Sequence, residues 1–264
     1  MLLLKLVLIP GFLLLISLAG KRWGPSVAGW LSGLPVVVGP ILFFLAVEQG
    51  PAFATQSAIA ALSAMSAMIT FCVVYAQAAQ RCNWPAALLI ALLSWSLVAW
   101  VLSVMPASLL LSVIAAATAL LAAPYLFPAA QPLLAGPAPK SDRLLLRMLA
   151  GALLTLAVTW FASTLGERWS GLLAVFPVLG SVMAVFSQQT RGPAFTAALL
   201  RATATGMYAF AAFCLTLALT LPRWDGWAFV LGVAVSLVML LMTKRRAAPS
   251  PLRTGTAPPV KLED

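Results

Sequence analysis

Three polar residues within one apolar stretch could do chemistry inside a membrane. Arg201, Thr205 and Tyr208 are spaced at i, i+4 and i+7, so a helix places them on one face. A guanidinium at that depth is costly unless it meets an anion, water or carbonyl groups. The pattern predicts a cationic anchor for an anionic substrate or a lipid phosphate. Alternatively, Arg201 snorkels to the surface and the two hydroxyls bond to their own helix.

Two proline-containing stretches form a second candidate site. Positions 33–40 read GLPVVVGP, and positions 175–181 read VFPVLGS. A proline that interrupts a helix frees backbone N–H and C=O groups at membrane depth, as in the binding sites of secondary transporters. The alternative is two kinked helices that pack through small residues. The candidate binding residues are Pro35, Gly39, Pro40, Pro177, Gly180, Ser181, Ser63, Ser66, Arg201, Thr205 and Tyr208.

The titratable residues argue against several kinds of chemistry. The chain has no histidine, and its three cysteines form neither a metal-ligand cluster nor a CxxC pair. Glu48, Glu167 and Asp225 all fall at the edges of apolar stretches, so a carboxylate that couples protons or sodium at the midplane is not expected. We therefore predict no enzyme activity, no metal and no cofactor.

The elements that must position these residues are membrane helices. Of the 264 residues, 62% are hydrophobic and only 8% are charged, more apolar surface than one water-soluble core can hide. Apolar runs of about 20 residues suffice to cross a bilayer as helices. The sequence predicts an all-α membrane protein with nine spans, at 2–19, 27–47, 52–79, 85–104, 107–127, 144–164, 169–187, 194–221 and 225–242.

The charges predict how these spans are oriented. The net charge of +10 is spread over short connections and the tail, which indicates a topogenic signal rather than nucleic-acid binding. One set of alternate connections carries Lys21, Arg22, Arg81, Lys140, Arg143, Arg147, Arg191, Lys244, Arg245 and Arg246. The other set carries only Arg168 and Arg223 among its basic residues. We expect a bacterial-type inner membrane protein with its N-terminus outside and its C-terminus in the cytoplasm. The first span could instead be a cleaved signal peptide, although a basic n-region is lacking.

The phrase GPAF occurs at 50–53 and again at 192–195, which reveals an internal repeat. At this offset of 142, 13 of the 44 positions from 35 to 78 are identical, against roughly one in ten by composition. Five crossings separate equivalent points, so the second copy is inverted. The predicted units are a first repeat at 1–105, a linker span and Pro-rich loop at 106–143, a second repeat at 144–243 and a disordered basic tail at 244–264. GPAF itself is predicted to start a helix.

One segment carries a family resemblance. The stretch RWSGLLAVFPVLGSVMAVF at 168–186 resembles the Arg-Trp, Leu-rich, proline-containing pattern of GlpM-like small inner-membrane proteins of about four spans. The resemblance covers about 20 residues of each half, and the first half has four extra residues before Pro35. It implies a fused, inverted pair of such units and no particular activity.

These observations support two hypotheses on function. The first is a small secondary transporter or facilitator with a midplane site between the two repeats and an anionic or other small-molecule substrate. The second is a non-transporting scaffold or lipid-handling subunit in envelope assembly. In both, the lipid bilayer is the surrounding partner, and nucleic acid is not.

Overall fold

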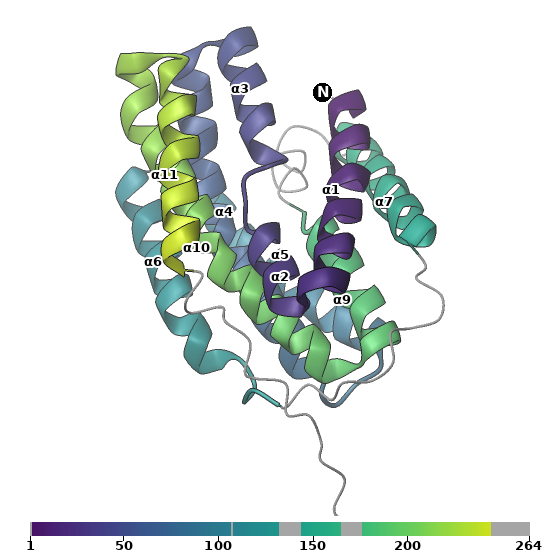
Figure 1. Cartoon of the computed structure of the whole chain (residues 1–264). Coiled ribbons are helices and arrows are strands. Elements are labelled where there is room, and N and C mark those ends of the chain that lie inside the picture. The colour runs from purple at the N-terminus through teal and green to yellow at the C-terminus, as the bar shows by residue number, and fades with distance from the viewer. Residues whose placement is uncertain (1, 107, 132–143, 165–175, 244–264) are drawn as a thin grey trace, which may run out of the picture.

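The computed structural model describes residues 2–106, 108–131, 144–164 and 176–243. Every regular element in these residues is a helix, and the helices form an elongated bundle (Figure 1). In chain order they are α1 (Leu2–Trp23), α2 (Pro25–Ser32), α3 (Val38–Gln49), α4 (Pro51–Ala78), α5 (Trp84–Val104), α6 (Leu109–Leu126), α7 (Leu144–Thr164), α9 (Val178–Arg191), α10 (Pro193–Trp224) and α11 (Trp227–Thr243). Predictions on the Pro-rich loop at 132–143, the start of the seventh span at 165–175 and the tail at 244–264 lie outside the described residues.

The helices differ in whether they are long and apolar enough to cross a membrane. Four of the described helices satisfy both conditions, namely α4, α5, α6 and α10. α3, α11 and the segments Gly11–Gly20 of α1 and Leu146–Ala157 of α7 are apolar but shorter. The all-α prediction is confirmed, with four candidate membrane-spanning helices, whereas the count of nine spans stays a prediction.

α4 and α10 pack against each other at the centre of the bundle. α4 also contacts α3, α5 and α6, and α10 contacts α2, α9, α11 and α6. The buried residues of α4 include many alanines, and Ala58, Ala67 and Ala76 are fully buried. Small side chains let helices approach closely, which is how membrane helices gain packing energy without a hydrophobic driving force. The outer helices α5 and α6 instead expose leucines such as Leu93 and Leu110, at 63% and 70%.

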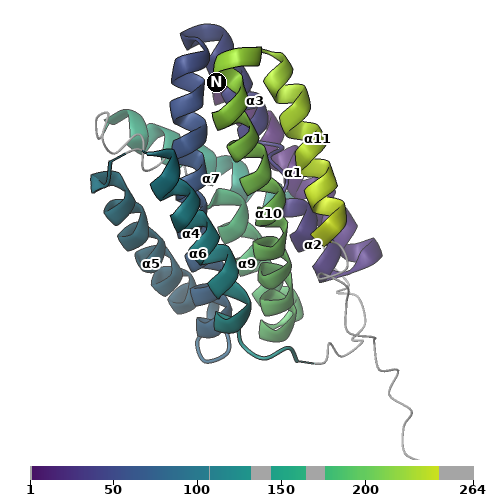
Figure 2. The ribbon, with the colours of Figure 1, turned by 90° about the vertical axis from the view of Figure 1, so that its left-hand side faces the viewer.

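The connections between helices alternate between the two ends of the bundle. The joint between α3 and α4 and the turn between α10 and α11 lie at the end where α1 begins (Figures 1 and 2). The loop between α4 and α5 and the joint between α9 and α10 lie at the opposite end (Figures 1 and 2). Arg81 and Arg191 belong to this second end, which we call the basic end. Glu48 and Asp225 belong to the first.

Three Gly-Pro pairs join consecutive helices with the same backbone geometry. Gly24, Gly50 and Gly192 have φ of 89°, 89° and 83°, with ψ of 175°, 164° and 177°. This region is accessible essentially only to glycine. The proline that follows is the first residue of α2, α4 or α10, where its missing N–H costs no hydrogen bond. The prediction that GPAF starts a helix is confirmed in both copies.

Candidate functional site

The helix expected at 27–47 is broken at its first proline. α2 ends at Ser32 and α3 begins at Val38, so five residues between them are not helical. Within this break the N–H of Val36 donates to the carbonyl of Leu34 at 2.8 Å, a tight three-residue turn. The N–H of Gly39 then donates to the carbonyl of Pro35 at 2.7 Å and so starts α3. Of the two readings of this stretch, an interrupted helix and a kinked helix, the structure has the interrupted one.

The second proline stretch repeats the same turn. The N–H of Val178 donates to the carbonyl of Phe176 at 2.8 Å, and the N–H of Ser181 donates to that of Pro177 at 2.8 Å. Each of these four residues lies 142 positions after its counterpart in the first break. Pro177, with φ −76° and ψ 58°, directly precedes α9. The two stretches therefore share one backbone conformation, although the residues before 176 lie outside the described part of the chain.

The two breaks meet in one apolar cluster. Val36 and Val37 from the first break pack on the same group of buried side chains as Phe176 and Leu179 from the second. Ser181 is the polar exception, because its hydroxyl is buried and has no hydrogen-bond partner among the described residues. A buried hydroxyl without a partner is costly, so this oxygen is available to a water or a ligand atom.

Small residues let the helices that follow the two breaks contact the central helices α4 and α10. A Cβ added to Gly39 in α3 would lie 3.5 Å from the ring of Phe213 in α10. A Cβ added to Gly180 in α9 would lie 3.3 Å from the ring of Phe71 in α4 and 2.6 Å from Met68. Phe71 and Phe213 are equivalent under the 142-residue offset, whereas Gly39 and Gly180 are one position out of register, because Gly39 is equivalent to Ser181. Pro40 lies in the first turn of α3.

The predicted hydroxyls of α4 and α10 bond to their own helices. Ser63 donates to the carbonyl of Ala60 at 2.9 Å, and Ser66 to that of Ser63 at 2.7 Å. Thr205 donates to the carbonyl of Arg201 at 3.0 Å. This is the second of the two alternatives for these side chains, and it leaves their hydrogens unavailable to a ligand.

Arg201 and Tyr208 contact α6 and the residues just after it rather than converge on the breaks. A guanidinium nitrogen of Arg201 donates to the carbonyl of Pro128 at 2.6 Å, just beyond α6, and the guanidinium lies 5.4 Å from the ring of Phe127. The hydroxyl of Tyr208 donates to the carbonyl of Leu120 within α6 at 3.2 Å. Arg201 thus reaches the end of the bundle, as in the snorkelling alternative.

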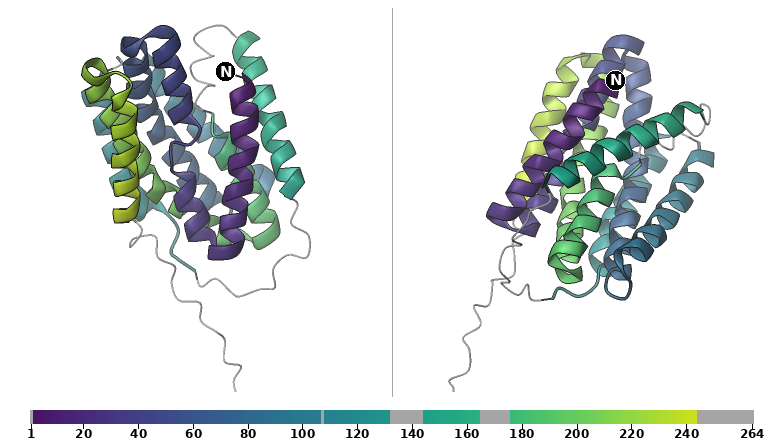
Figure 3. Two further views of the ribbon diagram at one scale, coloured as in Figure 1. Left: turned by 45° about the horizontal axis from the view of Figure 1, so that its top comes forward. Right: turned by 90° about the vertical axis from the view of Figure 1, so that its right-hand side faces the viewer.

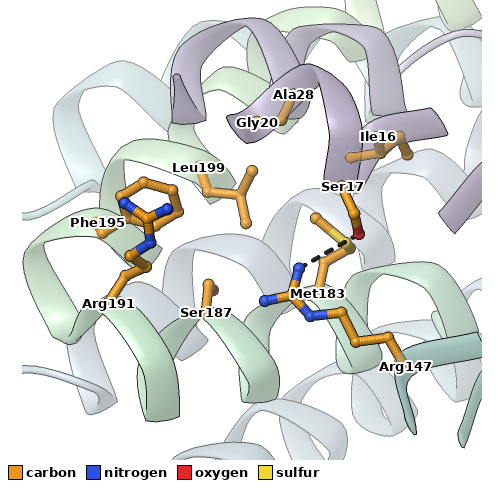
Figure 4. Close-up of a pocket in the computed structure, with 10 residues that line it drawn as sticks. All are labelled: Ile16, Ser17, Gly20, Ala28, Arg147, Met183, Ser187, Arg191, Phe195 and Leu199. Carbon is orange, nitrogen blue, oxygen red and sulfur yellow. Dashed lines mark hydrogen bonds between the residues drawn. The ribbon is translucent and has the colours of Figure 1, made fainter. Parts of the chain in front are cut away.

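A polar pocket at the basic end was not predicted from the sequence. It encloses about 30 Å³ between α1, α2, α7, α9 and α10. Its polar lining comprises Ser17, Arg147, Ser187 and Arg191 (Figure 4). The two arginines were identified only as members of the basic side, because no spacing in the sequence shows that residues 44 positions apart share a pocket. We call this cavity the arginine pocket.

The described residues hold no group of three or more His, Cys, Asp or Glu side chains that could bind a metal ion. Compared with family models, curated proteins and solved structures, the chain matches none. The resemblance to GlpM-like proteins therefore stays a prediction, and the functional argument rests on the geometry of this chain.

Proposed function

We propose that the chain is a small secondary transporter or facilitator whose substrate site is formed where the two broken segments meet. The observation that carries the proposal is the pair of hydrogen bonds repeated, residue for residue, at Pro35 and Pro177. Interrupted helices in matching positions of two halves are typical of transporter binding sites, because they present backbone groups inside the membrane.

The helix contacts support an inverted duplication of residues 1–105 and 144–243. α4 packs on α3 and α5, as its counterpart α10 packs on α9 and α11. The equivalent helices α1 and α7 lie side by side (Figure 3), as do α4 and α10. Pairing of equivalent elements is expected around a pseudo-twofold axis. α6, the predicted linker, contacts both α4 and α10 and so lies along the seam.

Such symmetry gives two states of nearly equal energy. If the copies exchange their conformations, a site between them opens first to one side of the membrane and then to the other. At the two breaks, the side chains of Val37 and Leu179 are only half-buried. A small rearrangement would therefore expose them. The buried hydroxyl of Ser181 is a polar group that a substrate can use at this point.

The orientation follows from the charges. The basic end carries Arg22, Arg81 and Arg191, whereas the described carboxylates Glu48 and Asp225 belong to the other end. We assign the basic end to the cytoplasm of a bacterial-type inner membrane, which places the N-terminus outside and the C-terminus inside.

A second function is favoured by the apolar lining of the breaks. Val36, Val37, Phe176 and Leu179 all pack against one cluster of buried apolar side chains in the present conformation. If that contact never opens, the chain is a scaffold or lipid-handling subunit that keeps the symmetric fold without transport. The same experiment decides between the two functions.

The test is solute entry into proteoliposomes, followed by stopped-flow light scattering with a panel of neutral and anionic solutes. This readout does not depend on the charge of the solute. We expect faster entry of at least one solute than in empty liposomes, and loss of this flux when Pro35→Ala and Pro177→Ala are combined. Pro124→Ala is the matched control, because Pro124 lies inside α6 and away from the breaks. If no solute enters faster than in empty liposomes while the protein stays folded, the transporter proposal is wrong.

A further inference from the structure

The arginine pocket brings together residues of both copies. Ser17 comes from α1 in the first copy, whereas Arg147, Ser187 and Arg191 come from α7 and α9 in the second. Figure 4 shows Ser187 between the two guanidinium groups, with Arg147 on one side and Arg191 on the other. Two cations from different helices thus face one small cavity.

Arg147 is oriented by fixed contacts. Its guanidinium donates to the hydroxyl of Ser17 at 3.2 Å and lies 5.6 Å from the ring of Phe186 (Figure 4). Its Nε atom is buried, so the side chain is held deep in the wall of the pocket. A planar guanidinium that is already positioned loses little freedom when it binds an oxyanion through two parallel hydrogen bonds.

Arg191 forms the accessible side of the pocket. It is exposed to solvent, and its guanidinium lies 5.3 Å from the ring of Phe195. It is also the last residue of α9, so its side chain lies where a ligand would enter from the basic end. The hydroxyl of Ser187 is already engaged with the carbonyl of Ala184 at 3.1 Å and with Thr196 at 3.0 Å. The exposed guanidinium of Arg191 is therefore the donor that an entering ligand reaches first.

The size and charge of the cavity define the ligand chemistry. A cavity of about 30 Å³ has room for two or three atoms the size of a water oxygen. That volume admits the oxygens of one anionic group but not a large ligand. In the described part of the chain, both carboxylates, Glu48 and Asp225, lie at the other end of the bundle. The described basic residues at this end, among them Arg22, Arg81 and Arg191, attract anions.

We propose that the arginine pocket binds the oxygens of a phosphate-type anion, held by Arg147 and Arg191 and presented at the cytoplasmic face. Two sources share this chemistry, the headgroup of an anionic phospholipid and a free phosphate in solution. The membrane surface concentrates anionic lipid beside basic residues, and the open side at Arg191 admits either source. The site does not require that the chain transports anything, because binding and flux are measured separately.

The test is native mass spectrometry of the full-length protein, with one arm for each source. In the first arm the probe is phosphatidylglycerol, compared with phosphatidylcholine, and in the second it is inorganic phosphate. We expect Arg191→Gln to weaken binding of at least one anionic probe about three- to tenfold, since Arg191 is exposed and its contribution is screened. Arg147→Gln is expected to weaken it about tenfold or more. The matched control is Arg81→Gln, which removes one exposed charge from the same end.

The two arms also identify the source. A loss confined to phosphatidylglycerol assigns the pocket to lipid, a loss confined to phosphate assigns it to a soluble anion, and a loss in both arms supports the shared chemistry. Arg147→Lys keeps the charge without the planar fork and replaces Arg147→Gln if that variant does not fold. The proposal is overturned if Arg191→Gln and Arg147→Gln, or Arg147→Lys where the glutamine variant does not fold, both bind the two probes as tightly as Arg81→Gln does.

Discussion

A close backbone contact between α2 and α10 predicts a substitution that should damage the fold. Gly33 at the end of α2 lies against Gly206 in the middle of α10. A Cβ added to Gly206 would lie 3.0 Å from the Cα and 3.1 Å from the nitrogen of Gly33, and nearer still to the carbonyl oxygen of Trp30. Carbon atoms normally approach to about 3.5–4.0 Å, so α2 and α10 must separate by at least several tenths of an ångström.

This separation cannot be relieved by a flexible side chain, because the three atoms nearest to the new methyl all belong to the backbone. Overpacking of a well-packed core costs about 1–3 kcal/mol, and we expect Gly206→Ala to lower the free energy of unfolding by about 3 kcal/mol. The matched control is Gly11→Ala in α1, where a Cβ meets nothing within 4 Å. Alanine is the better helix former there, so the control should be neutral or up to about 1 kcal/mol more stable.

The assay is unfolding of the purified protein by increasing SDS in mixed micelles, followed by tryptophan fluorescence. Gly206→Ala should unfold at a clearly lower SDS fraction than the wild type, and Gly11→Ala should not. Equal midpoints for the two variants would refute the backbone contact between α2 and α10, and with it the placement of the first broken segment against the second copy.

Three further predictions use the same preparation. Gly50→Ala and Gly192→Ala should each lower the free energy of unfolding by about 1–3 kcal/mol, because alanine is strained at these positive φ angles. The control Gly226→Ala should leave the free energy of unfolding unchanged. Equal effects of all three substitutions would argue against the observed geometry of the Gly-Pro helix joints. A membrane-impermeant maleimide should modify Cys82 from the basic end and leave the two cysteines within α4 and α10 unmodified, as peptide mass spectrometry would show, because these are fully buried. Arg201→Ala should lower the free energy of unfolding by about 1–2 kcal/mol, because the variant loses the hydrogen bond to the carbonyl of Pro128. It should not affect anion binding to the arginine pocket, and reduced anion binding would contradict the assignment of that pocket.

The sequence predicted those features that depend on local composition. Apolar runs gave the helices, and Gly-Pro pairs gave the helix starts, because proline without an N–H and glycine at positive φ act within a few residues. The offset of 142 pointed to Pro35 and Pro177 as equivalent, and the structure gives them the same hydrogen bonds. This success reflects a turn conformation that the proline itself largely dictates.

Features that depend on packing between distant helices could not be predicted. The spacing of Arg201, Thr205 and Tyr208 placed them on one face, but it could not show that α6 covers that face and accepts two of their hydrogen bonds. The arginine pocket has the same origin, since α1 and α7 must pack together before Ser17 and Arg147 meet. Sequence periodicity assigns a face to a residue, whereas tertiary contacts decide what that face touches.

The central claim, that the two broken segments line a site open alternately to each side, is tested most directly by cysteine accessibility. Val37→Cys and Leu179→Cys occupy equivalent, half-buried positions in the two breaks and are studied one at a time in a Cys82→Ser background. A membrane-impermeant maleimide is applied to proteoliposomes from one side and then from the other. The account predicts that each cysteine reacts from both sides. Cysteines that stay unreactive, or that react from one side only, would contradict it.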